Sequence, residues 1–189
     1  MKTALASVES RGFSLVEVMV SVIVIAVGML GIAKMHALAL ASTGAARMRS
    51  IAALEAASLA SAMHTNRTYW ASAGVPPATI NITGNTISDA TLGAAMDCTS
   101  NSGRPRPICT SVQLAAYDLQ TWASSLTALL PNDTAAITCS NTPSSPVTCT
   151  IQIVWIENAV GVNAQEANQA ANAGPAAFQK PTYTLYVEP

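Results

Sequence analysis

The strongest hydrophobic pattern lies near the start of the chain, in an apolar run from Phe13 to Ala33 whose one ionisable residue is Glu17. A helix of this length measures about 32 Å, which matches the hydrocarbon core of a bilayer. Lys34 closes the run, and Lys2 and Arg11 precede it. Because basic residues ahead of a span favour a cytoplasmic leader, the pattern predicts one membrane-spanning helix with the following domain outside the cytoplasm.

Two simpler interpretations fit this run poorly. A secretory signal peptide has a shorter apolar region followed by a small-residue cleavage site, whereas this run is longer and no clear site follows it. In an ordinary anchor, Glu17 would cost about 2.5–3.5 kcal/mol inside the bilayer. A cut between Gly12 and Phe13 would create an α-amine four residues ahead of Glu17, on the same helix face. Glu17 could then compensate the charge of this amine or that of a neighbouring copy.

The helical pattern continues beyond the apolar run. No proline occurs between Phe13 and Gly74, and residues 35–67 are rich in alanine, leucine and methionine, which favour helices. Apolar residues recur there at steps of three and four, which predicts one buried stripe. The stripe comprises Leu38, Ala41, Ala45, Met48, Ala52, Ala56, Leu59 and Met63. We therefore expect a single helix from Phe13 to about Arg67.

After Trp70 the composition shifts to Gly, Pro, Thr, Asn and Ser, which is typical of short strands and turns. Alternation of apolar and polar residues predicts strands at 79–83, 136–139, 147–156 and 183–187, the middle two forming a hairpin. We expect an irregular connection at 86–109 and an exposed loop at 157–180.

A second helix is predicted between the first strand and the hairpin. Thr110 and Gln113 have the spacing of a capping box, and Pro131 marks the end of the helix. Its expected apolar face consists of Val112, Ala115, Leu119, Trp122, Leu126 and Leu129.

Composition narrows the class of protein. The 189 residues are 50% hydrophobic and only 10% charged, with a formal net charge of −1. This balance argues against disorder and against general attraction to nucleic acid phosphates. With two histidines, His36 and His64, a multi-histidine metal enzyme is close to excluded, and no metal site is expected. A small membrane-linked or secreted protein remains.

The four cysteines indicate disulfides rather than a metal site. Cys98, Cys109, Cys139 and Cys149 lack the short spacings of zinc ligands. The membrane span places them outside the cytoplasm, where disulfides persist. Three connectivities are possible, and we favour Cys98–Cys109 with Cys139–Cys149, since each closes a loop of about ten residues worth about 2–3 kcal/mol.

No catalytic constellation emerges from the sequence. Asp118 and Glu157 are isolated carboxylates, the first expected on a helix surface and the second where a loop begins. Arg104 and Arg106 lie inside the favoured Cys98–Cys109 loop and are possible contacts to a phosphate or carboxylate. A solvated loop stiffened by prolines is the favoured interpretation of that segment. We predict neither enzymatic activity nor a cofactor.

The segment Arg11-Gly12-Phe13-Ser14-Leu15-Val16-Glu17 resembles the class III signal of type IV pilins and type II secretion pseudopilins. The resemblance implies cleavage between Gly12 and Phe13 by prepilin peptidase, followed by N-methylation of Phe13. It also implies that Glu17 pairs with the N-terminus of a neighbouring subunit during filament assembly.

The resemblance implies an α+β, pilin-like fold, in which a long N-terminal helix packs on a small antiparallel sheet stapled by disulfides. The domains expected are a removed leader at 1–12, a transmembrane and filament-core helix at 13–34, its amphipathic continuation at 35–70 and a globular domain at 71–189. The protein would sit in the inner membrane of a Gram-negative bacterium with a periplasmic domain, and later in the extracellular pilus.

Major pilins usually carry a proline inside the apolar segment, and this chain has none. Together with the segments 114–122 and 183–187, this resembles PilV-type minor pilins. The resemblance implies a structural subunit of a pilus tip or priming complex that promotes assembly, and so twitching motility and adhesion. Its partners would be other minor pilins, the major pilin and a tip adhesin. A type II secretion minor pseudopilin and a surface binding module, for adhesion or DNA uptake, are the alternatives; nucleic acid binding is otherwise not expected.

Overall fold

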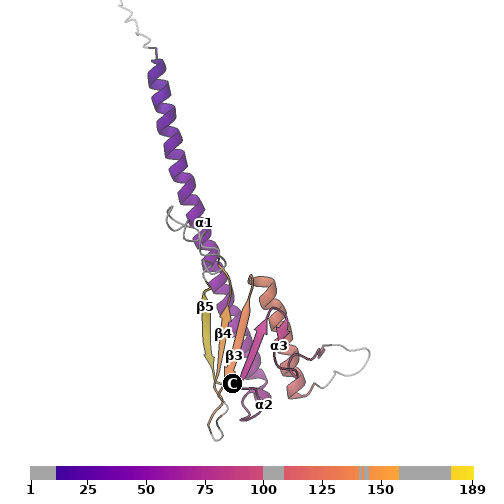
Figure 1. Ribbon diagram of the computed structural model, residues 1–189. Coiled ribbons are helices and arrows are strands. Elements are labelled where there is room, and N and C mark those ends of the chain that lie inside the picture. Colours follow the sequence, from indigo (N-terminus) through magenta and orange to yellow (C-terminus); the bar gives the residue numbers. More distant parts are fainter. Residues whose placement is uncertain (1–11, 100–108, 141, 143–144, 158–179) are drawn as a thin grey trace, which may run out of the picture. The chain divides into compact units, whose positions relative to one another are not determined.

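The computed structural model of the protein describes residues 12–99, 109–140, 142, 145–157 and 180–189. Its elements are shown in Figure 1. In chain order they are α1 (Leu15–Thr65), α2 (Arg67–Trp70), β1 (Thr79–Thr83), β2 (Thr86–Ile87), α3 (Ser111–Leu129), β3 (Thr134–Cys139), β4 (Cys149–Val154) and β5 (Thr182–Val187). The chain divides into two compact units, Met1–Ala41 and Ser42–Pro189.

The first unit contains the apolar part of α1. Every residue from Gly12 to Ala37 is exposed, including the large apolar side chains Val16, Ile23 and Leu30. In the described part of the chain, α1 is the one helix whose length and composition would let it cross a membrane, and its most apolar stretch has no buried residue. This stretch therefore differs from the core helix of a soluble protein, which would be mostly covered.

The second unit contains the rest of α1, which follows the predicted amphipathic pattern. Ala45 and Met48 are half-buried, and Ala52, Ala56, Leu59 and Met63 are buried. These four fully covered positions confirm the second half of the stripe. They lie at steps of three and four, so they line one face of the helix.

The long helix ends two residues earlier than the sequence predicted. α1 stops at Thr65, and α2 begins at Arg67. Between them Asn66 has the non-helical angles φ −112° and ψ 53°, and its buried side-chain amide donates to the carbonyl oxygen of Ser111 at 2.7 Å. An asparagine favours such a break because its side chain satisfies backbone groups outside a helix.

The strands form one antiparallel sheet in the order β2-β1-β3-β4-β5. Figure 1 shows β3, β4 and β5 of this sheet side by side. The register pairs Ile82 with Ala135 and then Ile153, and Ile80 with Ile137 and then Ile151. These residues alternate with exposed or half-exposed ones along each strand, and most of the latter are polar. One face of the sheet is therefore buried and the other faces outward.

The hydrophobic core lies between the buried sheet face and the helices of the second unit. It joins Leu59 and Met63 of α1, Leu119 and Trp122 of α3, and the inward isoleucines of the strands. All three tryptophans of the chain, Trp70, Trp122 and Trp155, are buried. The core is thus built by the second unit alone.

The helix α3 starts with the predicted capping box, but its buried face differs from the prediction. The Thr110 hydroxyl accepts from the Gln113 backbone N–H, and the Gln113 side chain accepts from the Thr110 backbone N–H, which is the capping box. Leu129, expected on the apolar face, is instead 45% exposed. Ala116 and Ala123 are buried in its place. Because alanine is small, these positions let α3 pack closely on its neighbours.

The remaining elements differ from the prediction mainly in their ends. β3 begins two residues earlier than expected, β4 is shorter at both ends, and β5 begins at Thr182 rather than Tyr183. The segment at 86–109 was expected to be irregular, but Thr86 and Ile87 form β2 against β1. A strand of two residues is too short to show an alternating pattern. Of the loop expected at 157–180, residues 158–179 lie outside the described residues.

Candidate functional site

The bond between Gly12 and Phe13 lies in non-helical chain directly ahead of α1. Both residues are exposed, and the Phe13 side chain is 83% exposed. The first hydrogen bond of the helix is donated by the Val18 backbone N–H to the Ser14 carbonyl at 3.2 Å. An exposed bond outside regular structure is accessible to a peptidase, which needs to bind the backbone in an extended form.

Glu17 lies in the first turn of α1, where the helix dipole favours a negative charge. It is exposed, and it makes no ion pair with any residue in the described part of the chain. Ser21, one turn further along the same face, donates to the Val18 carbonyl at 2.9 Å and so is satisfied within the helix. Glu17 is therefore a charged group on an apolar stretch of helix, with no ion-pair partner among the described residues.

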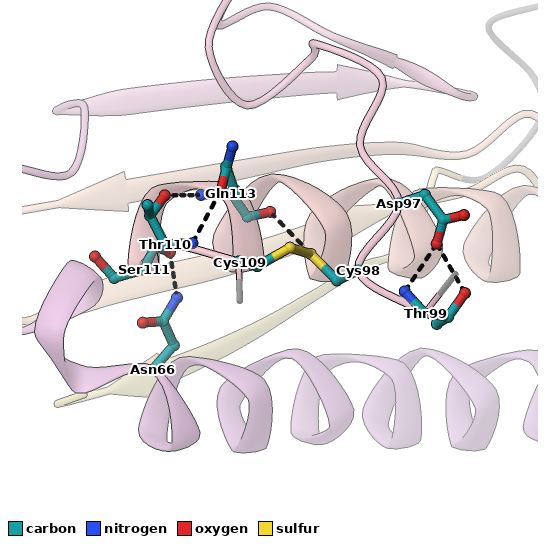
Figure 2. Close-up of a disulfide and its surroundings, with 8 residues drawn as sticks. All are labelled: Asn66, Asp97, Cys98, Thr99, Cys109, Thr110, Ser111 and Gln113. Carbon is teal, nitrogen blue, oxygen red and sulfur yellow. Dashed lines mark hydrogen bonds between the residues drawn. A yellow bond between two sulfur atoms is a disulfide. The ribbon is translucent and has the colours of Figure 1, made fainter. Parts of the chain in front are cut away.

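The four cysteines lie in two disulfides, Cys98–Cys109 and Cys139–Cys149, the connectivity favoured from the sequence. Figure 2 shows the first beside the start of α3, close to the capping box of Thr110 and Gln113. The second joins the paired end residues of β3 and β4. Both therefore brace secondary structure and leave no cysteine in the chain free for metal or redox chemistry.

Residues 9–33 match the family described as the prokaryotic N-terminal methylation motif. The chain carries this methylation motif. No curated protein and no solved structure matches the chain. The motif supports a place in the type IV pilin superfamily, as a pilin-like protein or a pseudopilin, and this superfamily is structural rather than enzymatic. It also implies interaction with prepilin peptidase and with other pilins, and it fits anchoring in the inner membrane.

The methylation motif and the fold agree. The motif ends within the exposed part of α1, and the second unit adds a five-stranded antiparallel sheet and two disulfides. This is an α+β, pilin-like architecture. The candidate residues Gly12, Phe13 and Glu17 lie within the matched motif. The sheet and both disulfides lie in the second unit, outside the motif.

Away from the methylation motif, two partly buried ionisable side chains, Tyr69 and Asp133, have a raised pKa. Burial and, to a smaller extent, Asp89 raise the pKa of Tyr69 to about 12, so this phenol stays protonated at neutral pH. Burial raises the pKa of Asp133, whose carboxylate accepts from the Thr127 hydroxyl at 3.5 Å. Among the described residues, no three His, Cys, Asp or Glu side chains come together in a way that could hold a metal ion.

Glu157 has surroundings that differ from the prediction. It was expected to be isolated where a loop begins, but its side chain is only 5% exposed and forms an ion pair with Arg49 of α1. The Arg49 Nη2 and Nε donate to the two carboxylate oxygens at 3.3 and 3.4 Å, and the Trp155 indole N–H donates at 3.1 Å. The partners lie 108 positions apart along the chain. No local spacing could have revealed this pair.

Two further candidates have different outcomes. Asp118 lies half-buried on α3, in a groove of about 290 Å³ that also includes Glu55 of α1. Burial raises the pKa of Asp118. The residues that line the groove around it belong to α1 and α3. Arg104 and Arg106, the possible ligand contacts, lie outside the described residues.

Proposed function

We propose that this protein is a minor pilin of the type IV pilus, a structural subunit of the tip or priming complex that promotes pilus assembly and, through it, twitching motility and adhesion. The observation that carries the proposal is the position of the methylation motif. Its residues 15–33 lie on a long, uncovered apolar helix, with an exposed Gly12–Phe13 bond before the helix and Glu17 in its first turn.

The proposed sequence of events begins in the inner membrane, where the helix at 13–34 spans the bilayer and the domain from residue 71 lies in the periplasm. Prepilin peptidase removes the leader at 1–12 by cutting after Gly12, and the amine of Phe13 is methylated. The segment at 35–70 continues the helix toward the globular domain. The mature protein then leaves the membrane as part of an extracellular pilus.

In this proposal, Glu17 determines how neighbouring helices align during assembly. A carboxylate in an apolar medium is costly, and pairing it with the charged amine of a neighbouring Phe13 lowers that cost. Because a register shift would separate the two charges, the pair favours one alignment of neighbouring helices. The partners are other minor pilins, the major pilin and a tip adhesin.

A minor role is supported by the continuity of α1, which runs from Leu15 to Thr65 with no proline. The segments 114–122 and 183–187 support the PilV-type assignment within the minor pilins. The same methylation motif also serves type II secretion pseudopilins, which makes such a pseudopilin the second candidate. Deletion of the gene separates the two, since loss of surface pili and twitching supports the first and loss of exoprotein secretion supports the second.

The direct test is the intact mass of the protein recovered from sheared surface filaments. We expect the mass of residues 13–189 plus one methyl group, lowered by two hydrogens for each of the two disulfides until the sample is reduced. A protein that is absent from filaments and whose membrane form still begins at Met1 would overturn the proposal.

The role of Glu17 has its own test. We expect Glu17→Ala to be cleaved normally but to enter filaments about tenfold less than the wild type, because the charge pair is lost. Ser21→Ala is the matched control, since Ser21 lies on the same face and its hydroxyl donates to the Val18 carbonyl of its own helix. Equal incorporation of Glu17→Ala and wild-type protein, measured by quantitative immunoblotting of sheared pili, would exclude the pairing role.

A further inference from the structure

The outward face of the sheet has an unusual composition. On β1, β3, β4 and β5, the inward positions are apolar and form the core, while the outward positions alternate with them. None of the outward positions on these four strands carries a charge, and most are threonine. The charged residues that flank β5, Lys180 and Glu188, lie outside the strand.

The strand register arranges these side chains in rows across the sheet. One row joins Asn81, Ala136, Gln152 and Thr184, and the next joins threonines of β1, β3 and β4 to Tyr186. Neighbouring strands lie about 4.8 Å apart, which is close to the length of one sugar unit in an extended polysaccharide. Apart from Ala136, every position in these two rows carries a hydroxyl or amide group. The rows therefore offer hydrogen-bonding groups at a spacing that successive sugars could use.

This face is open to solvent. Asn81, Gln152 and Thr184 are exposed, and the Tyr186 ring is 80% exposed on the edge strand β5. The described helices of this unit contribute to the core on the opposite face of the sheet. A large aromatic ring left this exposed has no role in the packing of the core.

The chemistry of the face selects the ligand class. The absence of charge disfavours nucleic acid and other polyelectrolytes, which bind through ionic contacts. The threonine, asparagine and glutamine side chains do not form the continuous apolar surface that a partner helix would need. A tyrosine combines an apolar ring with a polar tip. A sugar matches this combination, because its C–H face packs on an aromatic ring while its hydroxyls form hydrogen bonds.

We propose that the outward sheet face binds a neutral polysaccharide, stacked on Tyr186 and hydrogen-bonded by Gln152, Asn81 and Thr184. The site lies wholly in the unit Ser42–Pro189 and requires neither cleavage nor Glu17. Its failure would therefore leave the proposed pilus role untouched, and the reverse also holds.

The test is depletion of the full-length protein from solution by suspended cellulose, chitin and amylose, with alginate and double-stranded DNA as charged comparisons. The protein is kept in lauryldimethylamine oxide, since a glycoside detergent would compete for the site. We expect binding to at least one neutral polymer that changes little between about 0.05 and 0.5 M NaCl. Tyr186→Ala and Thr184→Lys should each weaken that binding about tenfold or more.

Ala128→Lys is the matched control, because it adds the same charge at an exposed position of α3 and should bind as the wild type does. Near-ultraviolet circular dichroism of the three buried tryptophans verifies that each variant is folded. The proposal is overturned if the wild type binds none of the neutral polymers, or if both face variants bind as tightly as the wild type. Self-association that these two variants abolish would also overturn it, by assigning the face to a second copy.

Discussion

The two parts of α1 belong to one continuous helix but meet different surroundings. From Leu15 to Ala37 every residue is exposed, whereas Ala52, Ala56, Leu59 and Met63 further along are buried in the core of the second unit. Apart from Glu17, Lys34 and His36, the first part has apolar residues on all sides, which lipid or other helices would cover. The second part is apolar on one face, which the rest of its own chain covers.

The two parts of α1 contribute to different properties of the protein, the second to its stability and the first to its proposed function. The second part of α1 is fixed by its packing and by polar contacts, such as the Trp122 indole N–H that donates to the Glu55 carbonyl at 2.8 Å. The first part carries residues 15–33 of the methylation motif, Glu17 among them, but adds no residue to the core. Substitutions in the first part should therefore affect assembly, and substitutions in the second part should affect folding.

A proline in each part gives the largest expected contrast. Ala56→Pro removes a helical hydrogen bond and forces the ring against the preceding turn, at a cost of about 3 kcal/mol or more. Because Ala56 is fully buried, lost packing adds to this cost, and we expect the second unit to be unfolded or to melt far below the wild type. The readout is near-ultraviolet circular dichroism, since all three tryptophans are buried in that unit.

Val22→Pro is the matched substitution in the exposed part, where the valine is 59% exposed. It should leave the tryptophan signal and its melting temperature unchanged. If Val22→Pro lowered the melting temperature as much as Ala56→Pro, the two parts of α1 would not be energetically separate.

Substitution of Arg49 in the second part of α1 should have an intermediate effect on stability, and Arg47 provides the comparison. Among the described residues, Arg49→Ala leaves the Trp155 N–H as the one hydrogen-bond donor to the buried Glu157 carboxylate. This should destabilise the second unit by about 1–2 kcal/mol. The cost is below that of a fully buried pair because the Arg49 side chain is 60% exposed. Arg47→Ala removes the same charge from an exposed position and should change stability by less than about 0.5 kcal/mol.

Thermal unfolding of both arginine variants measures this difference. Equal melting temperatures would show that the ion pair contributes nothing to holding α1 on the end of the sheet. Glu157→Gln adds a further comparison, since it keeps an acceptor for the Trp155 N–H and removes the buried charge.

The features predicted correctly from the sequence are local ones. The capping box of Thr110 and Gln113, the stripe from Ala52 to Met63 and the alternation along β4 each depend on residues a few positions apart. At such short range, helix and strand periodicity determines which side chains share a face.

The features that were missed depend on how distant segments meet. The partner of Glu157 is Arg49, and no pattern within one segment connects them. Leu129 was placed on the buried face of α3 by spacing, but the helix packs through Ala116 and Ala123, whose small size suits close contact. The candidate residues Gly12, Phe13 and Glu17 come from a local motif, and their roles are predictions because the proposed partners are other molecules.

The smallest expected effect concerns Asp118, in the groove of the packed part that also includes Glu55 and Tyr117. Burial raises the pKa of Asp118 above the ordinary aspartate value of 3.8, so the folded protein binds this proton more tightly than the unfolded chain does. Ionised Asp118 therefore lowers stability at neutral pH, and this cost shrinks as the pH falls through the folded pKa. It is absent once the pH is below 3.8, where both states are protonated.

Asp118→Asn should consequently raise the free energy of unfolding at pH 7, and with it the melting temperature. The gain should be less than about 1 kcal/mol, because the side chain is only half-buried and water screens its charge. The gain over the wild type should disappear below pH 3.8. Glu188→Gln removes the same charge from an exposed position beyond β5 and should have no such pH-dependent gain. A gain for Asp118→Asn that persisted unchanged into acid would mean that the substitution acts through packing rather than charge. The asparagine would then stabilise the contact between α1 and α3 by fitting the groove better than aspartate does, at any pH.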